Sequence, residues 1–333
     1  MRAILRSLFV VCLLATACAG ASPGPAVAQE QTLDVRSSSQ PFKIDDPSAK
    51  TIGRLVWRGG IMVTANSRHF GGWSDLHVSP DGKSLTSISD EGAWLTATID
   101  YDGEANLAGL SNARVGQLHG LDGKLIATKA EADSEAMARL PDGSWLVAFE
   151  RDHRLWRYAT LTAMPVPVEG PAEIGRQPPN GGIEAMTALA DGRVIMISEE
   201  YSAQSGTVMG WIGTPSGGRH YHWRTFSYAT IPDFRPTAIA QMPDGSFAMI
   251  ERAFDIARGV RCRVMRFDAG QLVAGGTVQA EELARLASPY AVDNLEGIAA
   301  TRGPRGETLL WLISDDNFNP LQRNILLLFE LAK

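Results

Sequence analysis

The chain has little cysteine, and most of it lies near the start. Of the three cysteines in 333 residues, Cys12 and Cys18 fall within the first 28 residues, which leaves Cys262 alone in the rest. One cysteine cannot form an internal disulfide, so a disulfide framework is excluded for the remaining chain. Its stability must come from the burial of apolar side chains, for which a chain of about 300 residues is long enough.

Several signatures of known chemistry are also missing. There is no G-x-S-x-G, which argues against an ordinary α/β-hydrolase esterase, and there is no H-E-x-x-H or C-x-x-C. After residue 28 no apolar run approaches the ~20 residues of a membrane helix. Basic residues are fewer than acidic ones, 31 against 37, and the net charge is −6. This balance disfavours nucleic acid as a partner, because phosphates need a basic face, but it suits cations.

The first 28 residues have the pattern of a signal peptide. Arg2 and Arg6 precede an apolar run over residues 8–14, and Ala-Val-Ala at residues 26–28 fits a cleavage site. The apolar run is too short to span a bilayer. We therefore expect cleavage after Ala28 and a periplasmic or secreted protein.

Lipidation of Cys18 is an alternative for this leader, although Ala15 stands where lipoproteins usually carry leucine. Beyond the leader, residues 29–50 are polar at their start, and we expect a flexible segment there. Residues 51–333 are expected to form the folded domain, and we expect this domain to be a monomer.

One sequence unit recurs five times after this segment. Each copy opens with a polar residue, continues through a short apolar strand and an Asp-Gly or similar turn, and ends a second apolar strand with a charged residue. Asp-Gly between alternating apolar runs indicates a β-hairpin. The opening residues, 49 to 60 positions apart, are Asp75, Glu135, Glu184, Thr237 and Glu296. The closing residues are Asp90, Glu150, Glu199, Glu251 and Asp315.

This repeat predicts an all-β chain folded as a single β-propeller of four-stranded blades. A third apolar strand follows each closing residue, and most intervals leave room for a fourth. Because an open array would leave two bare sheet edges, we expect the N-terminal segment 51–66 to complete the last blade with the C-terminal strands. Five repeats predict five blades, and the interval around the two chain ends is long enough for a sixth.

The opening residues of a propeller repeat lie on the innermost strands, so they are expected to form a ring around the axis. Carboxylates that lie so near to one another raise one another's pKa or require a cation. Ca²⁺ prefers oxygen ligands of this kind. We therefore predict a metal site formed by Asp75, Glu135, Glu184, Glu296 and Asp315. The alternative is that the acids accept hydrogen bonds from backbone N–H groups of the next blade and only join the blades. Thr237 interrupts the ring in either case.

Further side chains are candidates for substrate contact. Arg151 and Arg252 directly follow closing acids, where guanidinium groups would bind an anion, and Asn317 offers a neutral oxygen near the end of the last repeat. Ion pairs within a blade are the alternative for the arginines. His77, two residues after Asp75, is a candidate general base. The candidate catalytic residues are thus Glu135, Glu184 and His77.

Several of these segments resemble the phytase-like domain family described as "esterase-like activity of phytase". The resemblance rests on FGGWSDLHVSPDGKSLTSISDEG near residue 70, the repeated LPDG…ER, NLEGIA from Asn294, and SDDNFNPLQRNILLLFEL from Ser314, and it covers about residues 53–331. It implies an exported propeller that hydrolyses a small anionic phosphate or carboxylic ester, with Ca²⁺ in an acidic channel. A non-catalytic propeller that binds a ligand or partner remains the alternative.

Overall fold

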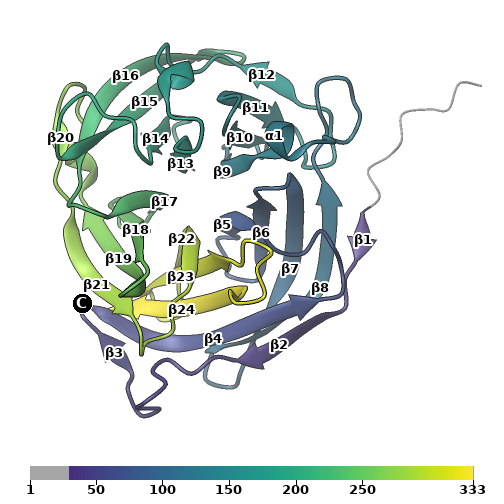
Figure 1. Cartoon of the computed structure of the whole chain (residues 1–333), viewed down its shortest axis with the longest axis vertical. Coiled ribbons are helices and arrows are strands. Elements are labelled where there is room, and N and C mark those ends of the chain that lie inside the picture. Colours follow the sequence, from purple (N-terminus) through teal and green to yellow (C-terminus); the bar gives the residue numbers. More distant parts are fainter. Residues whose placement is uncertain (1–29, 333) are drawn as a thin grey trace, which may run out of the picture.

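The structure is a computed structural model that describes residues 30–332. Five sheets stand around a central axis as the blades of a β-propeller, which confirms the predicted fold class (Figure 1), and all their strand pairs except β16–β20 are antiparallel. No sixth sheet is found within residues 30–332, so the blade count is five. The predicted signal peptide and Cys18 lie outside the described residues.

We number the blades from 1 to 5 in the order of their innermost strands along the chain. Blade 1 contains β5 (Trp73–Val78), β6 (Ser84–Ser89), β7 (Ala93–Tyr101) and β8 (Leu107–Gln117), with β1 (Gln31–Thr32) added to β8. Blade 2 contains β9 (Ser134–Arg139), β10 (Trp145–Phe149), β11 (Arg154–Tyr158) and β12 (Val166–Val168). Blade 3 contains β13 (Ile183–Ala188), β14 (Val194–Ser198), β15 (Thr207–Gly217) and β16 (His220–Ala229), with β20 (Thr277–Val278) parallel to β16.

Blade 4 contains β17 (Arg235–Gln241), β18 (Phe247–Asp255), β19 (Gly259–Phe267) and β21 (Glu281–Ala287). Blade 5 contains β22 (Asn294–Arg302), β23 (Thr308–Asp315), β24 (Ile325–Leu331) and β4 (Leu55–Ala65), with β2 (Val35–Ser39) and β3 (Thr51–Ile52) paired to β4. Helical structure is limited to α1 (Lys129–Ala132), η1 (Ile174–Arg176) and η2 (Ala269–Gln271).

The predicted closure of the ring is confirmed in blade 5. The N-terminal strand β4 pairs antiparallel with the C-terminal strand β24, from Met62 opposite Ile325 to Leu55 opposite Leu331. The first and last strands of the propeller therefore lie side by side in one sheet, where neither leaves an open edge.

The segment 29–50 was expected to be flexible, and this is wrong for two stretches. β1 pairs with β8 and β2 pairs with β4. Both are edge strands, which are held by backbone hydrogen bonds and do not need an apolar pattern. The polar sequence VRSSS of β2 therefore gave no sign of them.

The blades are held together by five separate apolar cores, one at each interface between neighbouring blades. Alternate side chains of a strand point to opposite faces of its sheet, so each blade contributes to two cores. Trp73 and Trp311, for example, are fully buried between blades 1 and 5. The turn of each first hairpin ends in a glycine with φ between 71° and 87°, which accounts for the repeated Asp-Gly and related pairs.

Candidate functional site

The first hairpin of every blade brings its opening and closing residues to the same end of the channel. In blade 2, Ser134 pairs with Phe149, and the other four hairpins have equivalent pairs. We call this end the acid mouth and the opposite end, where the five hairpin turns lie, the turn mouth. The acid mouth gathers predicted carboxylates from blades that are far apart in sequence.

A β-bulge lies at the start of each innermost strand. The register with the second strand shifts there by one residue, which leaves one residue without a partner. These unpaired residues are Ser74, Glu135, Glu184, Thr237 and Glu296. A bulge re-aims the side chain that it carries, so these positions, and not the predicted set, are the equivalent ones.

Asp75 is therefore displaced by one position from the predicted ring. Its Oδ2 accepts the backbone N–H of Met137 in blade 2 at 2.7 Å, and its Oδ1 accepts that of Leu76 at 2.7 Å. Burial raises the pKa of this carboxyl group well above its usual range, and the two N–H donors oppose that shift. Each oxygen of Asp75 accepts one backbone N–H, so this residue joins two blades, and its role as a metal ligand stays a prediction.

Blade 4 departs from the acidic pattern at both positions. The Thr237 hydroxyl donates to the carbonyl of Leu295 in blade 5 at 3.0 Å, so this residue also joins blades. In the other blades, the closing acid comes directly after the second-strand residue that pairs just before the bulge. In blade 4 that paired residue is Glu251, opposite Pro236, so Arg252 takes the closing position that was predicted for Glu251.

The two residues at this corner of blade 4 point to different surroundings. Glu251 is buried, and it accepts hydrogen bonds from Tyr228 of blade 3 and Arg263 of blade 4 at 2.7 and 2.6 Å. Arg252 faces the acid mouth, with its guanidinium 2.9 Å from Glu296 and 3.7 Å from Glu199. Blade 4 thus places a cation where the other blades place an acid.

Glu135 and Glu184 are the bulge carboxylates that lack partners. Neither makes a hydrogen bond or ion pair with any residue between 30 and 332, although Glu184 is only 8% exposed. Burial, followed by the charges of Glu135, Glu199 and Glu296, raises the pKa of Glu184 well above its usual range. Burial and the neighbouring acids also raise the pKa of Glu135. Such groups hold protons at neutral pH or attract a cation.

Three carboxylates of blade 2 form a compact group at this mouth. Asp133, Glu135 and Glu150 each present an oxygen, and these oxygens lie within 4.8 Å of one another. Glu150 also accepts the N–H of Gly182 in blade 3 at 3.1 Å, so it both joins blades and belongs to the group. Asp133 was not predicted, because it precedes the repeat and only the folded loop turns it inward.

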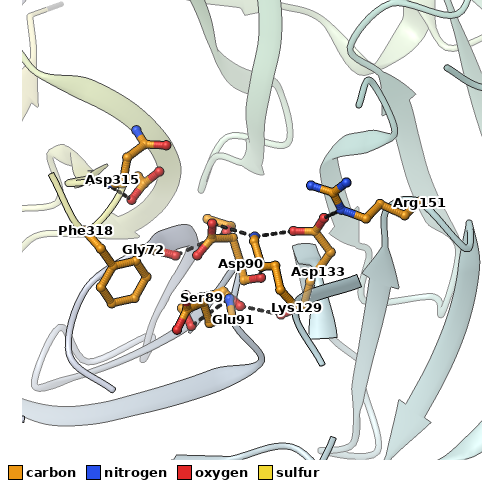
Figure 2. A network of polar contacts seen from close by, with 12 residues as sticks. Gly72, Ser89, Asp90, Glu91, Lys129, Asp133, Arg151, Asp315 and Phe318 are labelled. Carbon is orange, nitrogen blue, oxygen red and sulfur yellow. Dashed lines mark hydrogen bonds and ion pairs between the residues drawn. The ribbon is translucent and has the colours of Figure 1, made fainter. Parts of the chain in front are cut away.

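A lysine on α1 connects this group to blade 1 (Figure 2). The Lys129 ammonium donates to Asp90 Oδ2 at 2.7 Å and to Asp133, which also accepts from Arg151 Nε. Burial raises the pKa of Asp90, and Lys129 opposes the shift. Lys129 and Arg151 thus neutralise Asp133, Glu150 has only the N–H of Gly182, and Glu135 has neither a counter-charge nor a hydrogen bond within the described residues.

The closing sequence SDDNF meets the glycine pair of the first repeat at the junction of blades 5 and 1. Asp316 Oδ1 accepts the N–H of Gly72 at 3.0 Å, and the Phe318 ring lies beside Gly72 (Figure 2). Burial raises the pKa of Asp315 to about 7, and its Oδ1 accepts the N–H of Asn317 at 2.6 Å. Asn317 itself is exposed at the mouth, with φ of 46°.

The third catalytic candidate, His77, lies away from these acids. It follows Asp75 by two residues along β5, towards the turn mouth, and its ring packs edge-on against Trp145 at 5.2 Å. Burial and then the charge of Arg139 lower the pKa of His77 to about 4. The structure therefore groups Glu135, Glu184, Glu296 and Asp315 at the acid mouth with Arg151 and Arg252, and places His77 elsewhere.

Comparisons with known proteins place this geometry in context. A family model described as "Phytase-like: Esterase-like activity of phytase" matches residues 68–318. Comparison with curated proteins gives no significant match. Among the described residues, no helix combines the length and the apolar character needed to cross a bilayer.

Solved structures resemble the chain only distantly. A protein of unknown function from Dyadobacter fermentans has 12% identity and a TM-score of 0.42, over 91% of this chain and 99% of that one. A catalytically inactive virginiamycin B lyase from Staphylococcus aureus with quinupristin has 11% identity and a TM-score of 0.41, over 89% and 99%. A gluconolactonase from Xanthomonas campestris has 10% identity and a TM-score of 0.40, over 90% and 97%.

Resemblance at this level carries no conclusion about activity. The match to the family model does support a conclusion, because it spans most of the described residues. Its two ends, residues 68 and 318, lie in the segments that meet at the junction of blades 5 and 1. The chain belongs to the phytase-like family of proteins described by the esterase-like activity of phytase.

Proposed function

We propose that the protein is an exported ester hydrolase that acts on a small anionic phosphate or carboxylic ester at the acid mouth. The observation that carries the proposal is the pair of unpartnered carboxyl groups of Glu135 and Glu184 on neighbouring blades. Because each disfavours ionisation of the other, one can hold a proton while the other is ionised. That division supplies a general base for water and a general acid for the leaving alcohol.

The donor set beside this pair fits a divalent cation such as Ca²⁺. Asp133, Glu135 and Glu150 offer only carboxylate oxygens, which hard cations prefer, and Glu135 has no other counter-charge. A cation held by these three would polarise an ester oxygen by Lewis-acid chemistry. Of the predicted ligands, Glu184 and Glu296 lie in the surrounding ring, and Asp315 lies at the junction with blade 1.

The arginines differ in their availability for an anionic substrate. Arg151 uses Nε for Asp133 and is exposed, so its terminal nitrogens can reach an anion at the mouth (Figure 2). Arg252 is committed to Glu296 and Glu199 and would bind an anion only in exchange for one of them. We therefore assign substrate orientation to Arg151, with Asn317 at the same mouth.

The test is turnover of phytate, p-nitrophenyl phosphate and p-nitrophenyl acetate with Ca²⁺ or EDTA. Glu135→Gln and Glu184→Gln should each lower kcat/KM by about 100-fold or more, the usual size of an acid or base contribution. Glu104→Gln, at an exposed turn, is the matched control and should leave the rate unchanged. Unchanged rates in both mouth variants, with native melting curves, would reject these carboxyl groups as the catalytic pair.

A non-catalytic, partner-binding propeller is the competing proposal, and the blade-joining bonds of Asp75 and Thr237 favour it. It predicts no turnover of any ester in the panel. It also predicts that Ca²⁺ leaves the melting temperature unchanged, whereas a cation bound to the folded state raises it.

A further inference from the structure

The channel contains a cavity of about 370 Å³ on the turn-mouth side of Asp75. It is walled by the innermost strands of all five blades, each of which is the edge of its sheet. Edge strands leave N–H and C=O groups unpaired, so the wall offers hydrogen-bonding groups to a ligand. The volume lies within the range of small-molecule sites.

The charged groups that line this cavity are mainly basic. Arg139 ends β9 in blade 2 and Arg302 ends β22 in blade 5, and both belong to the lining. Neither guanidinium forms an ion pair with a carboxylate within residues 30–332, whereas most arginines there do. Arg302 donates only to the carbonyl groups of Gly306 and Pro243, at 3.5 and 3.3 Å. The lining has one acid, Asp75, whose two oxygens are already bound to backbone N–H groups.

Other acids near the turn mouth are satisfied within their own turns. Four of them, Asp81, Asp142, Asp191 and Asp244, accept from the N–H two residues later in the turn and from a serine hydroxyl or an arginine. The fifth, Glu307, accepts from the N–H of Arg305 and pairs with its guanidinium at 3.4 Å. None of them lines the cavity. The unpaired charge left inside the turn mouth is therefore positive.

Arg139 is held in place by aromatic packing. Its guanidinium lies 4.5 Å from the centre of the Trp145 ring, and His77 packs edge-on against the same ring at 5.2 Å. Stacking fixes the plane of the guanidinium and leaves its N–H groups free to donate. Neutral polar side chains on other walls, Thr187 and Gln241, can complete a hydrogen-bonding shell.

We propose that the turn mouth is a second binding site, which takes a small oxyanion, a carboxylate or a phosphate, between Arg139 and Arg302. Planar guanidinium groups bind both oxyanions through paired N–H···O bonds. The site is separate from the acid mouth and does not depend on whether esters are hydrolysed there. His77, neutral above about pH 5, contributes a hydrogen bond and no charge.

The test is calorimetric and fluorescence titration of the full chain with inorganic phosphate in one arm and succinate in the other, at fixed ionic strength with chloride as the reference. We expect saturable binding of at least one anion, and the preferred arm identifies the head group. Arg139→Gln combined with Arg302→Gln should weaken binding at least about tenfold, because charged hydrogen bonds are lost. Trp145→Phe should remove most of the fluorescence response.

Two further variants guard against indirect effects. Arg219→Gln with Arg224→Gln removes two exposed arginines that also lack carboxylate partners within the described chain, and it should leave affinity within about twofold. Arg139→Lys with Arg302→Lys keeps the charge and should retain part of the binding. Absence of saturable binding of either anion to the unmodified protein, or equal weakening in the Arg219/Arg224 control, would overturn the proposal.

Discussion

The two mouths of the channel are built by the same five hairpins but use their acids differently. At the turn mouth the aspartates accept hydrogen bonds from the N–H groups of their own turns. At the acid mouth, a β-bulge carries Glu135 and Glu184 out of reach of such donors. The comparison shows that an acid in a repeat is structural where backbone N–H groups surround it and a candidate for function where they do not.

The largest expected effect of this difference is on the pH dependence of stability. Burial raises the pKa values of Glu199, Glu296 and Asp315 to about 7, 8 and 7. Between about pH 5 and pH 8 the folded state therefore holds protons that the unfolded state has released, so the free energy of unfolding falls as pH rises. We expect each group to contribute a loss of up to about 3–4 kcal/mol across this window, since one pKa unit corresponds to about 1.4 kcal/mol, and the loss is measured by urea unfolding in EDTA.

The turn mouth is expected to titrate in the opposite sense. Burial opposes ionisation of Asp244, but hydrogen bonds from Ser246 and the charge of Arg266 lower its pKa, and its stabilising contribution is lost only as pH falls below about 4. Glu296→Gln should reduce the slope between pH 5 and 8, and Asp244→Asn should leave that slope unchanged. A free energy of unfolding that stays constant or rises from pH 5 to 8 would contradict the account of the acid mouth.

A glycine at each mouth gives the second contrast. A Cβ on Gly72 would lie 2.3 Å from Asp90 Oδ1 and 2.6 Å from the Phe318 ring, at φ of 67°. Gly245, in a hairpin turn, has φ of 87° and no heavy atom within 4 Å of the corresponding position. Gly72→Ala should cost about 2–3 kcal/mol, from backbone strain plus overpacking, and Gly245→Ala about 1 kcal/mol, from backbone strain alone. If urea unfolding gives the same loss of free energy of unfolding for both variants, the side chains at the junction of blades 5 and 1 move to make room for the extra methyl group, and the overpacking argument is wrong.

The smallest effects separate the acid that joins blades from the acid that does not. Asp75→Asn replaces one of the two carboxyl oxygens, which accept from the N–H groups of Met137 and Leu76, by an amide group and should destabilise the fold by about 1–2 kcal/mol. Glu184→Gln should change stability by less than about 0.5 kcal/mol or increase it, because it removes a buried charge that has no partner. Both variants are measured by urea unfolding at pH 8, the upper end of the window used above, where the ionised fraction of these carboxyl groups is highest. A larger loss for Glu184→Gln than for Asp75→Asn would reverse the two assignments.

The hairpin pattern was enough to predict the propeller, its five repeats and its closure, because Asp-Gly turns and apolar strands act locally. It could not predict which side chains face the channel. Ser74-Asp75 and Ser134-Glu135 look equivalent in sequence, yet the bulge falls on Ser74 in one blade and on Glu135 in the other. A shift of one residue reverses the direction of a strand side chain, and only the register reveals it.

Because the sequence does not reveal the strand register or the contacts between blades, the closing residue of blade 4 was predicted wrongly and some residues of the acid mouth were missed. Glu251 and Arg252 are adjacent in the sequence. Which of them faces the acid mouth is decided by the strand register, in which Glu251 pairs with Pro236. Asp133 and Lys129 lie before the repeat, so their positions depend on how the β8–β9 connection folds over the mouth. Interactions of this kind depend on contacts between blades, which no local pattern encodes.

The pairing of β4 with β24 constrains the order in which the molecule can be made. β4 is synthesised long before its partner β24, so the pairing of Leu55 with Leu331 can form only after residue 331 has been made. The ring therefore stays open until β24 has been synthesised, and a premature stop before residue 325 would leave β4 with only β2 and β3 as partners and β23 with only β22. For this topology, closure of the propeller depends on a strand that is made after the strands of all five blade hairpins.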